Sequence, residues 1–198
     1  MLESILRPTY QVYVVDPILR WVRHYSPMTI TYASCVTGVV AAIVLVLRLP
    51  SLATLLLLIS GFLDTLDGTV ARVGNKTSSL GSVLDIVSDR IVEFAIMFGL
   101  FALDPLHRGG LTLAMLGSCY LCITSFLVVG IFTPNESNKG FHYSPGLIER
   151  AEAFIFFILM IWLPNYFSWL ANLFTSLVVL TSFLRIKQFM NLSKVVNH

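Results

Sequence analysis

The stretch FLDTLDGTVARVGNKTSSLGSVLDIVSDRIVEF, residues 62–94, places four aspartates among long apolar runs. The aspartates are Asp64, Asp67, Asp85 and Asp89. Of the 198 residues in the chain, 56% are hydrophobic and only 12% are charged, and the mean hydropathy is +0.81. This composition excludes an ordinary soluble domain and is typical of a protein with several membrane-spanning segments. The stretch therefore raises the question of why carboxylates lie inside a membrane.

Apolar runs long enough to cross a bilayer, which takes roughly 20 residues per helix, occur six times along the chain. The predicted spans are 27–48, 51–72, 78–103, 109–132, 146–163 and 167–186. Pro27 and Pro145 each follow a serine, which fits a capping residue followed by proline in the first helical turn. We expect an all-α integral membrane protein that forms one domain over 1–198, with a six-helix bundle at 27–186 and a cytoplasmic tail at 187–198.

The segment that precedes the first span, 1–25, has a different pattern. Asp16 and Pro17 resemble a further helix start, and several apolar residues after them share one helical face: Val15, Ile18, Leu19 and Val22. We expect an amphipathic helix that lies on the membrane surface. An ordinary first helix packed against protein has the same pattern and stays open as an alternative.

Lysines and arginines gather on one side of the six predicted spans. That side receives ten of them, Arg7, Arg20, Arg23, Arg72, Lys76, Lys139, Arg150, Arg185, Lys187 and Lys194, whereas the other side receives Arg48 and Arg108. Short loops rich in Lys and Arg stay cytoplasmic, so we expect both termini and the site opening to face the cytoplasm from the cytoplasmic (inner) membrane. The net charge of +2 gives no indication of nucleic acid as a partner. Its distribution favours membrane lipids and anionic substrates.

The four aspartates lie at similar depth in the second and third predicted spans. Spacings of three and four residues put each pair on one helical face. An antiparallel hairpin of these two spans can therefore point all four carboxylates toward one another. Because ionised carboxylates near mid-bilayer each cost roughly 2.5 to 3.5 kcal/mol, the arrangement requires cations or protons.

Two kinds of cation could compensate the aspartates. Arg72 and Arg90 are candidates for structural ion pairs, and Arg90 with Glu93 has helical spacing. Two arginines are too few for four aspartates and a glutamate. Carboxylate ligands suit Mg²⁺, Mn²⁺ or Ca²⁺, and four carboxylates from two helices suit a two-metal site. Small residues beside the acids, with Arg72 at the rim, favour a nucleotide diphosphate as the ligand.

The spacing of these residues resembles a known family. Asp64-x2-Asp67-Gly68-x2-Ala71-Arg72-x8-Gly81-x3-Asp85-x3-Asp89 matches the signature of the CDP-alcohol phosphotransferases, with eight specified residues across 26 positions. The resemblance implies that an alcohol attacks the phosphorus bonded to the lipid alcohol of a CDP-linked lipid, with release of CMP. It also implies CDP-diacylglycerol as a substrate, two divalent ions, Mg²⁺ or Mn²⁺, with Ca²⁺ as an inhibitor or substitute, and a homodimer.

The resemblance also assigns roles to individual residues. It implies that Asp64, Asp67 and Asp85 are metal ligands, and that Asp89 is both a ligand and the general base. It places the CDP-lipid contacts at six positions: Thr31, Gly68, Ala71, Arg72, Ser78 and Gly81. Met28 departs from the family pattern, which has Asn or Asp there.

The acceptor alcohol is less sharply defined. The stretch GLIERAEAF, 146–154, resembles a segment of phosphatidylinositol-phosphate synthases, and Arg150 with Arg185 could bind a phosphorylated polyol such as glycerol 3-phosphate or an inositol phosphate. Snorkelling arginines are the alternative for these two residues. Unphosphorylated acceptors (inositol, serine or phosphatidylglycerol) stay open. A proton- or ion-coupled transporter is the rival class, because intramembrane carboxylates often carry protons or ions.

Overall fold

The computed structural model describes residues 16–22, 24–133 and 146–196, and this part of the chain is helical with no strand. Its helices are α2 (Asp16–Val22), α3 (Pro27–Val46), α4 (Pro50–Val73), α5 (Ser79–Ala102), α6 (Pro105–Phe132), α7 (Arg150–Trp162) and α8 (Phe167–Val196), with a short 3₁₀ turn, η2 (Pro164–Tyr166), before α8. The expectation of an all-α protein is confirmed.

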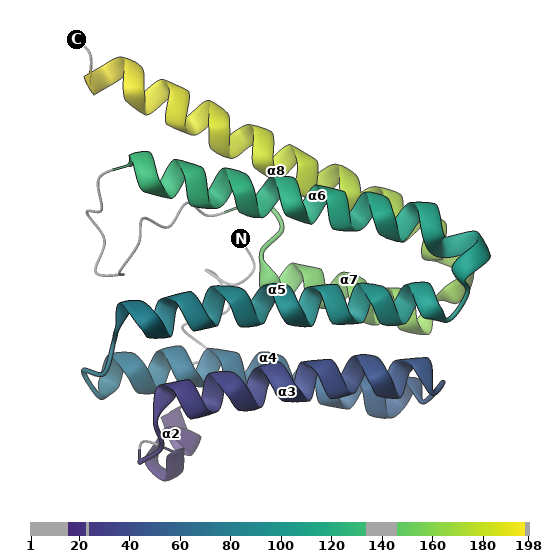
Figure 1. Ribbon diagram of the computed structural model, residues 1–198, viewed down its shortest axis with the longest axis horizontal. Helices are drawn as coiled ribbons and strands as arrows, with labels where there is room; N and C mark the ends of the chain where they lie inside the picture. The colour runs from purple at the N-terminus through teal and green to yellow at the C-terminus, as the bar shows by residue number, and fades with distance from the viewer. Residues whose placement is uncertain (1–15, 23, 134–145, 197–198) are drawn as a thin grey trace.

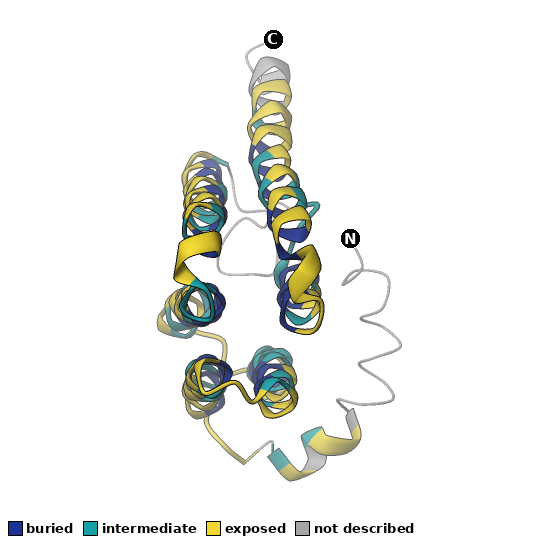
Figure 2. Ribbon diagram, turned by 90° about the vertical axis from the view of Figure 1, so that its right-hand side faces the viewer, coloured by how far each residue is buried: buried dark blue, intermediate teal, exposed yellow. Residues whose placement is uncertain are grey.

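The long helices run side by side along the longest axis of the molecule (Figure 1). Helix α3 packs against both α4 and α5, α6 packs against α8, and α7 contacts α4, α5 and α8. Seen end-on, the buried residues lie on the faces that the helices turn toward one another (Figure 2). Helix α7 thus joins the layer that holds the aspartates to the α6–α8 layer.

Four helical segments are long and apolar enough to cross a membrane: Pro27–Val46, Pro50–Val73, Pro105–Phe132 and Pro164–Asn191. Two of the six predicted spans do not meet this criterion. Helix α5 carries four ionisable residues, and α7 has only 13 residues. At 1.5 Å per residue α7 is about 20 Å long, which is shorter than a hydrocarbon core of about 30 Å. An integral membrane protein is supported, but the count of six spans is not confirmed.

Several predicted helix ends differ from the structure. Helix α6 begins at Pro105, because Asp104 accepts a hydrogen bond from the His107 backbone N–H (3.3 Å) and proline occupies the first turn. A hydrogen bond from the His107 side chain, more than this backbone bond, lowers the pKa of the Asp104 carboxyl. Helix α7 begins at Arg150 and not at 146. Helix α8 continues to Val196, so most of the predicted tail at 187–198 is helical.

The first described helix, α2, packs against protein. Leu19 and Val22 contact a small buried cluster of Ile30, Leu66 and Val70, whereas Trp21 is 82% exposed. Two of the four residues on the predicted apolar face, Leu19 and Val22, thus pack against protein, as the alternative expected. Val15 and most of the segment 1–25 lie outside the described residues.

Small residues bring α3 close to α5. A Cβ on Gly38 would lie 2.6 Å from the methyl carbons of Val92, and one on Gly99 would lie 3.2 Å from the Ala42 carbonyl oxygen. Helices in a membrane associate through such close packing, because lipid tails are as apolar as the helices themselves. The contact fixes α5 beside the α3–α4 pair and thereby sets where its aspartates lie.

Candidate metal centre

A short turn between α4 and α5 brings the two aspartate-bearing helices together. Asn75 has a φ of 49°, a left-handed conformation that asparagine tolerates better than most residues. Ser78 then caps α5, because its hydroxyl oxygen accepts a hydrogen bond from the Gly81 N–H at 3.0 Å. The two helices run antiparallel from this turn, as the spacing of the aspartates predicts.

Three of the four aspartates form a compact group. Asp64 and Asp67 of α4 and Asp85 of α5 each offer a carboxylate oxygen, and these oxygens all lie within 4.8 Å of one another. Asp67 is buried, with 5% of its surface exposed, and the other two are half-buried. All-oxygen ligation of this kind suits the hard cations Mg²⁺, Mn²⁺ and Ca²⁺. The donor set therefore fits the divalent metal expected from the sequence.

Asp89 joins this group through an arginine from α7. Arg150 Nη1 contacts both Asp89 Oδ1 and Asp64 Oδ1, one oxygen from each helix of the hairpin. The side chains are largely shielded, with 14% of Arg150 and 19% of each aspartate exposed. The structure thus brings together all four predicted metal ligands and one predicted acceptor-binding residue.

The position of Arg150 depends on how α7 begins. Glu149 is the N-cap residue, and its side chain and that of Glu152 form a reciprocal capping box with the backbone of the first turn. The Glu152 carboxylate accepts from the Glu149 N–H at 3.2 Å, and the Glu149 carboxylate also accepts from the Gly146 N–H at 3.3 Å. These bonds fix the backbone of Arg150, the first helical residue.

A second ion pair lies next to Asp89 on α5. Arg90 Nη1 is 2.7 Å from Glu93 Oε2, and Arg90 Nη2 is 3.8 Å from Asp89 Oδ2. Glu93 is buried, with 6% of its surface exposed. The predicted pairing of Arg90 with Glu93 is confirmed. Because Arg90 pairs with Glu93, its positive charge is not fully available to balance the neighbouring Asp89.

The residues predicted to contact the CDP lipid lie on α3, in the last turns of α4 and at the start of α5. The Thr31 hydroxyl lies 2.5 Å from Asp67 Oδ2 and 3.1 Å from the Pro27 carbonyl oxygen, so it holds a carboxylate of the group. Arg72, in the last turn of α4, donates to Thr69 Oγ1 at 3.2 Å. A Cβ on Gly68 would lie 3.2 Å from Arg72 Nη1, so glycine leaves room for this guanidinium.

The remaining predicted contacts lie around the same turn. Ser78 serves as the α5 cap, and a Cβ on Gly81 would lie 3.1 Å from its hydroxyl oxygen. Ala71 is half-buried beside Arg72. The structure thus gives several of these residues a local structural role in shaping the end of the hairpin.

The second predicted acceptor residue, Arg185, lies between α8 and α6. It is buried and donates to the Cys122 carbonyl oxygen at 3.0 Å and to Ser125 Oγ at 3.2 Å. A Cβ on Gly146 would lie 3.4 Å from Arg185 Nη2, so the segment that leads into α7 passes close to this guanidinium. Arg185 therefore contacts α6, whereas Arg150 contacts α4 and α5.

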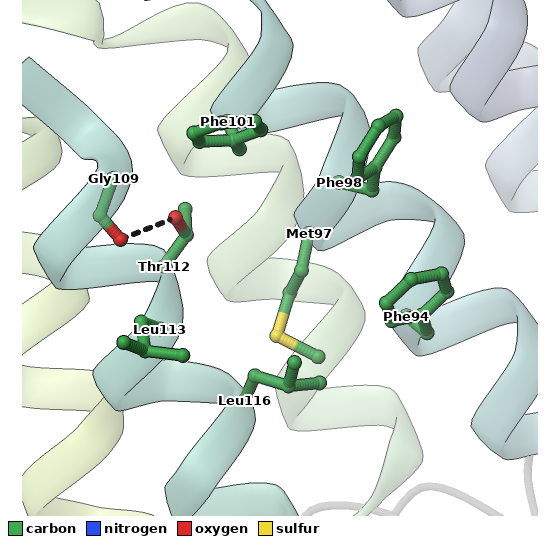
Figure 3. A pocket seen from close by; sticks show the side chains of 8 residues that line it. All are labelled: Phe94, Met97, Phe98, Phe101, Gly109, Thr112, Leu113 and Leu116. Carbon is green, nitrogen blue, oxygen red and sulfur yellow. Dashed lines mark hydrogen bonds between the residues drawn. The ribbon is translucent and has the colours of Figure 1, made fainter. Parts of the chain in front are cut away.

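An apolar pocket of about 190 Å³ lies elsewhere, between α5 and α6. Its lining is mainly aromatic and aliphatic, and Figure 3 shows it: Phe94, Met97, Phe98, Phe101, Gly109, Thr112, Leu113 and Leu116. The polar contact drawn there is the Thr112 hydroxyl, which donates to the Gly109 carbonyl oxygen at 3.1 Å. None of the predicted site residues lines this pocket, so we place the chemistry at the aspartates.

The bond from Arg150 to the aspartates is the feature that sequence reasoning missed. Arg150 and Asp89 are 61 residues apart, and no periodicity links them. The available signal was local: Glu149 and Glu152 have the spacing of an N-cap and its third helical residue, which marks the start of α7 at Arg150.

Comparison with known protein families identifies the class of protein to which the chain belongs. The family described as CDP-alcohol phosphatidyltransferase matches residues 24–185 of the chain. The chain belongs to the CDP-alcohol phosphatidyltransferase family, and it is therefore a membrane transferase of phosphate-containing groups in phospholipid synthesis. The resemblance drawn from the aspartate signature is confirmed. Members of this family depend in general on divalent metals, which agrees with the three clustered aspartates.

Several individual relatives are similar to the chain. Inner membrane protein YnjF of Escherichia coli (strain K12) is 31% identical over 168 residues, which cover 81% of this chain and 81% of that protein. Archaetidylinositol phosphate synthase of Methanothermobacter thermautotrophicus is 35% identical over 100 residues, which cover 50% of this chain but only 47% of the enzyme. Phosphatidylinositol phosphate synthase of Corynebacterium glutamicum is 28% identical over 130 residues, covering 66% of this chain and 58% of the enzyme.

One solved structure shares the fold. The crystal structure of Mycobacterium tuberculosis phosphatidylinositol phosphate synthase (PgsA1) with CDP-DAG bound matches with a TM-score of 0.68, covering 89% of this chain and 91% of that chain. The identity is 21%, so the match establishes the shared helical fold and no residue roles.

Proposed function

We propose that the protein transfers a phosphatidyl group from CDP-diacylglycerol to a small polar alcohol and releases CMP. The observation that carries the proposal is the meeting of Asp64, Asp67, Asp85 and Asp89 between α4 and α5 inside a membrane transferase of this family. The acceptor is a phosphorylated polyol, either glycerol 3-phosphate or an inositol phosphate. Relatives named as inositol phosphate lipid synthases favour this class of acceptor.

The four aspartates would hold two divalent ions, Mg²⁺ or Mn²⁺, with Ca²⁺ as an inhibitor or substitute. When bound, such ions supply positive charge that offsets the diphosphate and the leaving CMP. Thr31 supports this site because its hydroxyl fixes the orientation of the Asp67 carboxylate.

Asp89 acts as the general base in this proposal. It accepts the proton of the acceptor hydroxyl, the acceptor oxygen forms a bond to the phosphorus next to the lipid alcohol, and the bond from that phosphorus to CMP breaks. CMP leaves with the electron pair of the broken bond. Asp89 suits the role because it is shielded but not sealed, with 19% of its side chain exposed.

The end of the hairpin would bind the CDP part of the donor. Arg72 is the charged contact for phosphate, since a guanidinium can donate to two oxygens at once. The other contacts are those with small or hydroxyl-bearing side chains: Thr31, Gly68, Ala71, Ser78 and Gly81. Their small size leaves the backbone of α4 and α5 accessible to a ligand.

Arg150 and Arg185 would bind the phosphate of the acceptor. Gly146 lies near the Arg185 guanidinium and Arg150 begins α7 four residues later, so one short segment connects the two arginines. The alternative is an unphosphorylated acceptor, inositol, serine or phosphatidylglycerol, in which case the two arginines serve packing and charge balance alone.

We further propose that α5 and α7 cross the membrane with the four apolar segments, which gives six spans, both termini in the cytoplasm and a site that opens to that side. Of the charges within α5, Asp89 contacts Arg150 of α7, and Arg90 and Glu93 pair with each other. The chain would form one domain and a homodimer, with α2 at the membrane surface.

The test is CMP release by the purified full chain in detergent with CDP-diacylglycerol and Mn²⁺ or Mg²⁺. Glycerol 3-phosphate, inositol 1-phosphate, inositol, serine and phosphatidylglycerol are supplied one at a time, and the lipid product is identified by mass spectrometry. We expect turnover with one phosphorylated polyol. Turnover with an unphosphorylated acceptor alone would contradict the acceptor assignment, and no CMP with any of the five would contradict the reaction.

A further inference from the structure

One nitrogen of Arg150 occupies the place of a point cation between the two aspartate helices. Its Nη1 contacts both an oxygen of Asp64 and an oxygen of Asp89, so a single nitrogen bridges the two helices. Its Nε is buried and has no hydrogen-bond partner among the described residues. Arg150 is therefore held by its charge on two proposed metal ligands and not by a complete set of hydrogen bonds.

The charges at the site are incompatible with Arg150 and a full set of metal ions together. Four ionised aspartates carry four negative charges, and two divalent ions balance them completely. Arg90 and Glu93 already neutralise one another at 2.7 Å. An arginine left on Asp64 and Asp89 would then add an unbalanced positive charge next to two divalent ions in a shielded, low-dielectric site.

We propose that Arg150 is an internal cation that competes with a divalent ion for Asp64 and Asp89, so that metal loading transfers its guanidinium away from these two acids. The inference rests on the proposed function, since it takes both aspartates as metal ligands. The capping box fixes the backbone of Arg150, so the exchange is a movement of the side chain alone. The released guanidinium becomes available for the acceptor phosphate, and Asp89 becomes free to accept a proton.

Because linkage is reciprocal, the competition predicts that removing the arginine strengthens metal binding. The test measures Mn²⁺ binding to the purified full chain in detergent by electron paramagnetic resonance of free Mn²⁺. We expect Arg150→Gln to bind its weaker Mn²⁺ ion about tenfold more tightly than wild type. Arg150→Lys keeps a cation and should stay within about threefold of wild type.

A matched control is Arg108→Gln. This change removes a buried arginine that bonds to the Leu100 carbonyl oxygen and contacts none of the four aspartates. Its Mn²⁺ affinity should equal that of wild type. Should Arg150→Gln alone fail to fold, the double variant Arg150→Gln/Asp89→Asn removes both partners of one ion pair and is compared with Asp89→Asn. The double variant should bind Mn²⁺ more tightly than the single one.

Unchanged or weakened Mn²⁺ binding in Arg150→Gln would overturn the inference, as would equal tightening in Arg150→Lys. Different results would overturn the proposed function and the competition by Arg150. A wild-type chain that neither binds Mn²⁺ nor releases CMP overturns the proposed function. A wild-type chain that does both, with Arg150→Gln no tighter for Mn²⁺, overturns only the competition by Arg150.

Discussion

Two arginines that are largely shielded from solvent, Arg108 and Arg150, have opposite environments. Arg108 near the start of α6 donates from Nη1 to the Leu100 carbonyl oxygen at 3.2 Å, and its guanidinium carbon lies 4.3 Å from the centre of the Phe167 ring. These partners are a backbone oxygen near the end of α5 and an aromatic face of α8. Arg150 instead contacts two carboxylates from a group of four. Arg108 therefore has uncharged contacts. Arg150 lies among four carboxylates, and its single positive charge leaves an excess of negative charge there.

This difference separates a structural charge from a functional one. The hydrogen bond and ring contact of Arg108 join α5, α6 and α8 near the α5–α6 turn and involve no carboxylate, so this arginine has a structural role. The acids around Arg150 exceed the arginines available to them. Such an excess of carboxylates within a membrane is typical of a site that binds cations or protons during function. The proposed site therefore lies at the end of the bundle that holds Arg150.

The largest effect is expected from Asp89→Asn. The amide keeps the size of the side chain but cannot accept the proton of the acceptor, so CMP release should fall by about a thousandfold. The matched control is Asp104→Asn at the other end of α5, which should leave turnover within about twofold of wild type since it caps α6 and touches no predicted site residue. Near-normal turnover in Asp89→Asn would reject the assigned base.

The two arginines should separate activity from stability. Arg150→Gln should raise the KM for a phosphorylated acceptor by about tenfold or more, because a charged hydrogen bond to phosphate is lost. Arg108→Gln should lower the free energy of unfolding by about 1.5 to 3 kcal/mol while leaving that KM unchanged. Steady-state kinetics and thermal unfolding in detergent measure the two effects. A raised acceptor KM in Arg108→Gln, with an unchanged KM in Arg150→Gln, would contradict the roles given to the two arginines.

Thr31→Val tests the hydroxyl that holds Asp67. Removing a group that orients a ligand weakens metal binding, so the Mn²⁺ affinity should fall by about tenfold. Thr31→Ser should restore most of it. Thr112→Val is the control at the opposite end, since that hydroxyl bonds to the Arg108 carbonyl oxygen at 2.9 Å. Equal Mn²⁺ affinity in Thr31→Val and wild type would remove Thr31 from the site.

Gly68→Ala should give the smallest effect. The new methyl group would lie 3.2 Å from Arg72 Nη1, so the guanidinium must shift and the KM for CDP-diacylglycerol should rise by about threefold. Gly117→Ala provides the control, because nothing lies within 4 Å of a Cβ there. Both changes add helix propensity of up to about 1 kcal/mol, so only the KM should distinguish them. An unchanged KM for CDP-diacylglycerol in Gly68→Ala would contradict the assignment of Arg72 to donor binding.

The sequence was most informative where the signals are local. Ser26 and Pro27 begin α3 as predicted, although the Ser26 side chain makes no capping hydrogen bond. The i, i+3 and i, i+4 spacings placed the aspartates on facing sides of α4 and α5, which the structure confirms for the compact group of three. Asp104 and Pro105 carry the same start signal, although the predicted span begins at 109. Arg108 lies in the first turn of α6, where its guanidinium packs over the ring of the distant Phe167.

Tertiary contacts explain what the sequence did not predict. Arg150 reaches the aspartates only because α7 begins at a capping box and packs against α4 and α5. Leu19 and Val22 form an apolar face that lipid or protein could cover equally well, and only their contact with Leu66 and Val70 shows that protein covers these two residues. Periodicity identifies the faces of helices, but it does not identify their partners.

The central claim is that the four aspartates act by holding divalent ions, and the dependence of CMP release on those ions tests it most directly. The purified chain is assayed with CDP-diacylglycerol and its best acceptor in EDTA, and again after Mn²⁺ or Mg²⁺ is restored in excess. The account predicts no turnover in EDTA and full recovery with either ion. Undiminished CMP release in EDTA would contradict it.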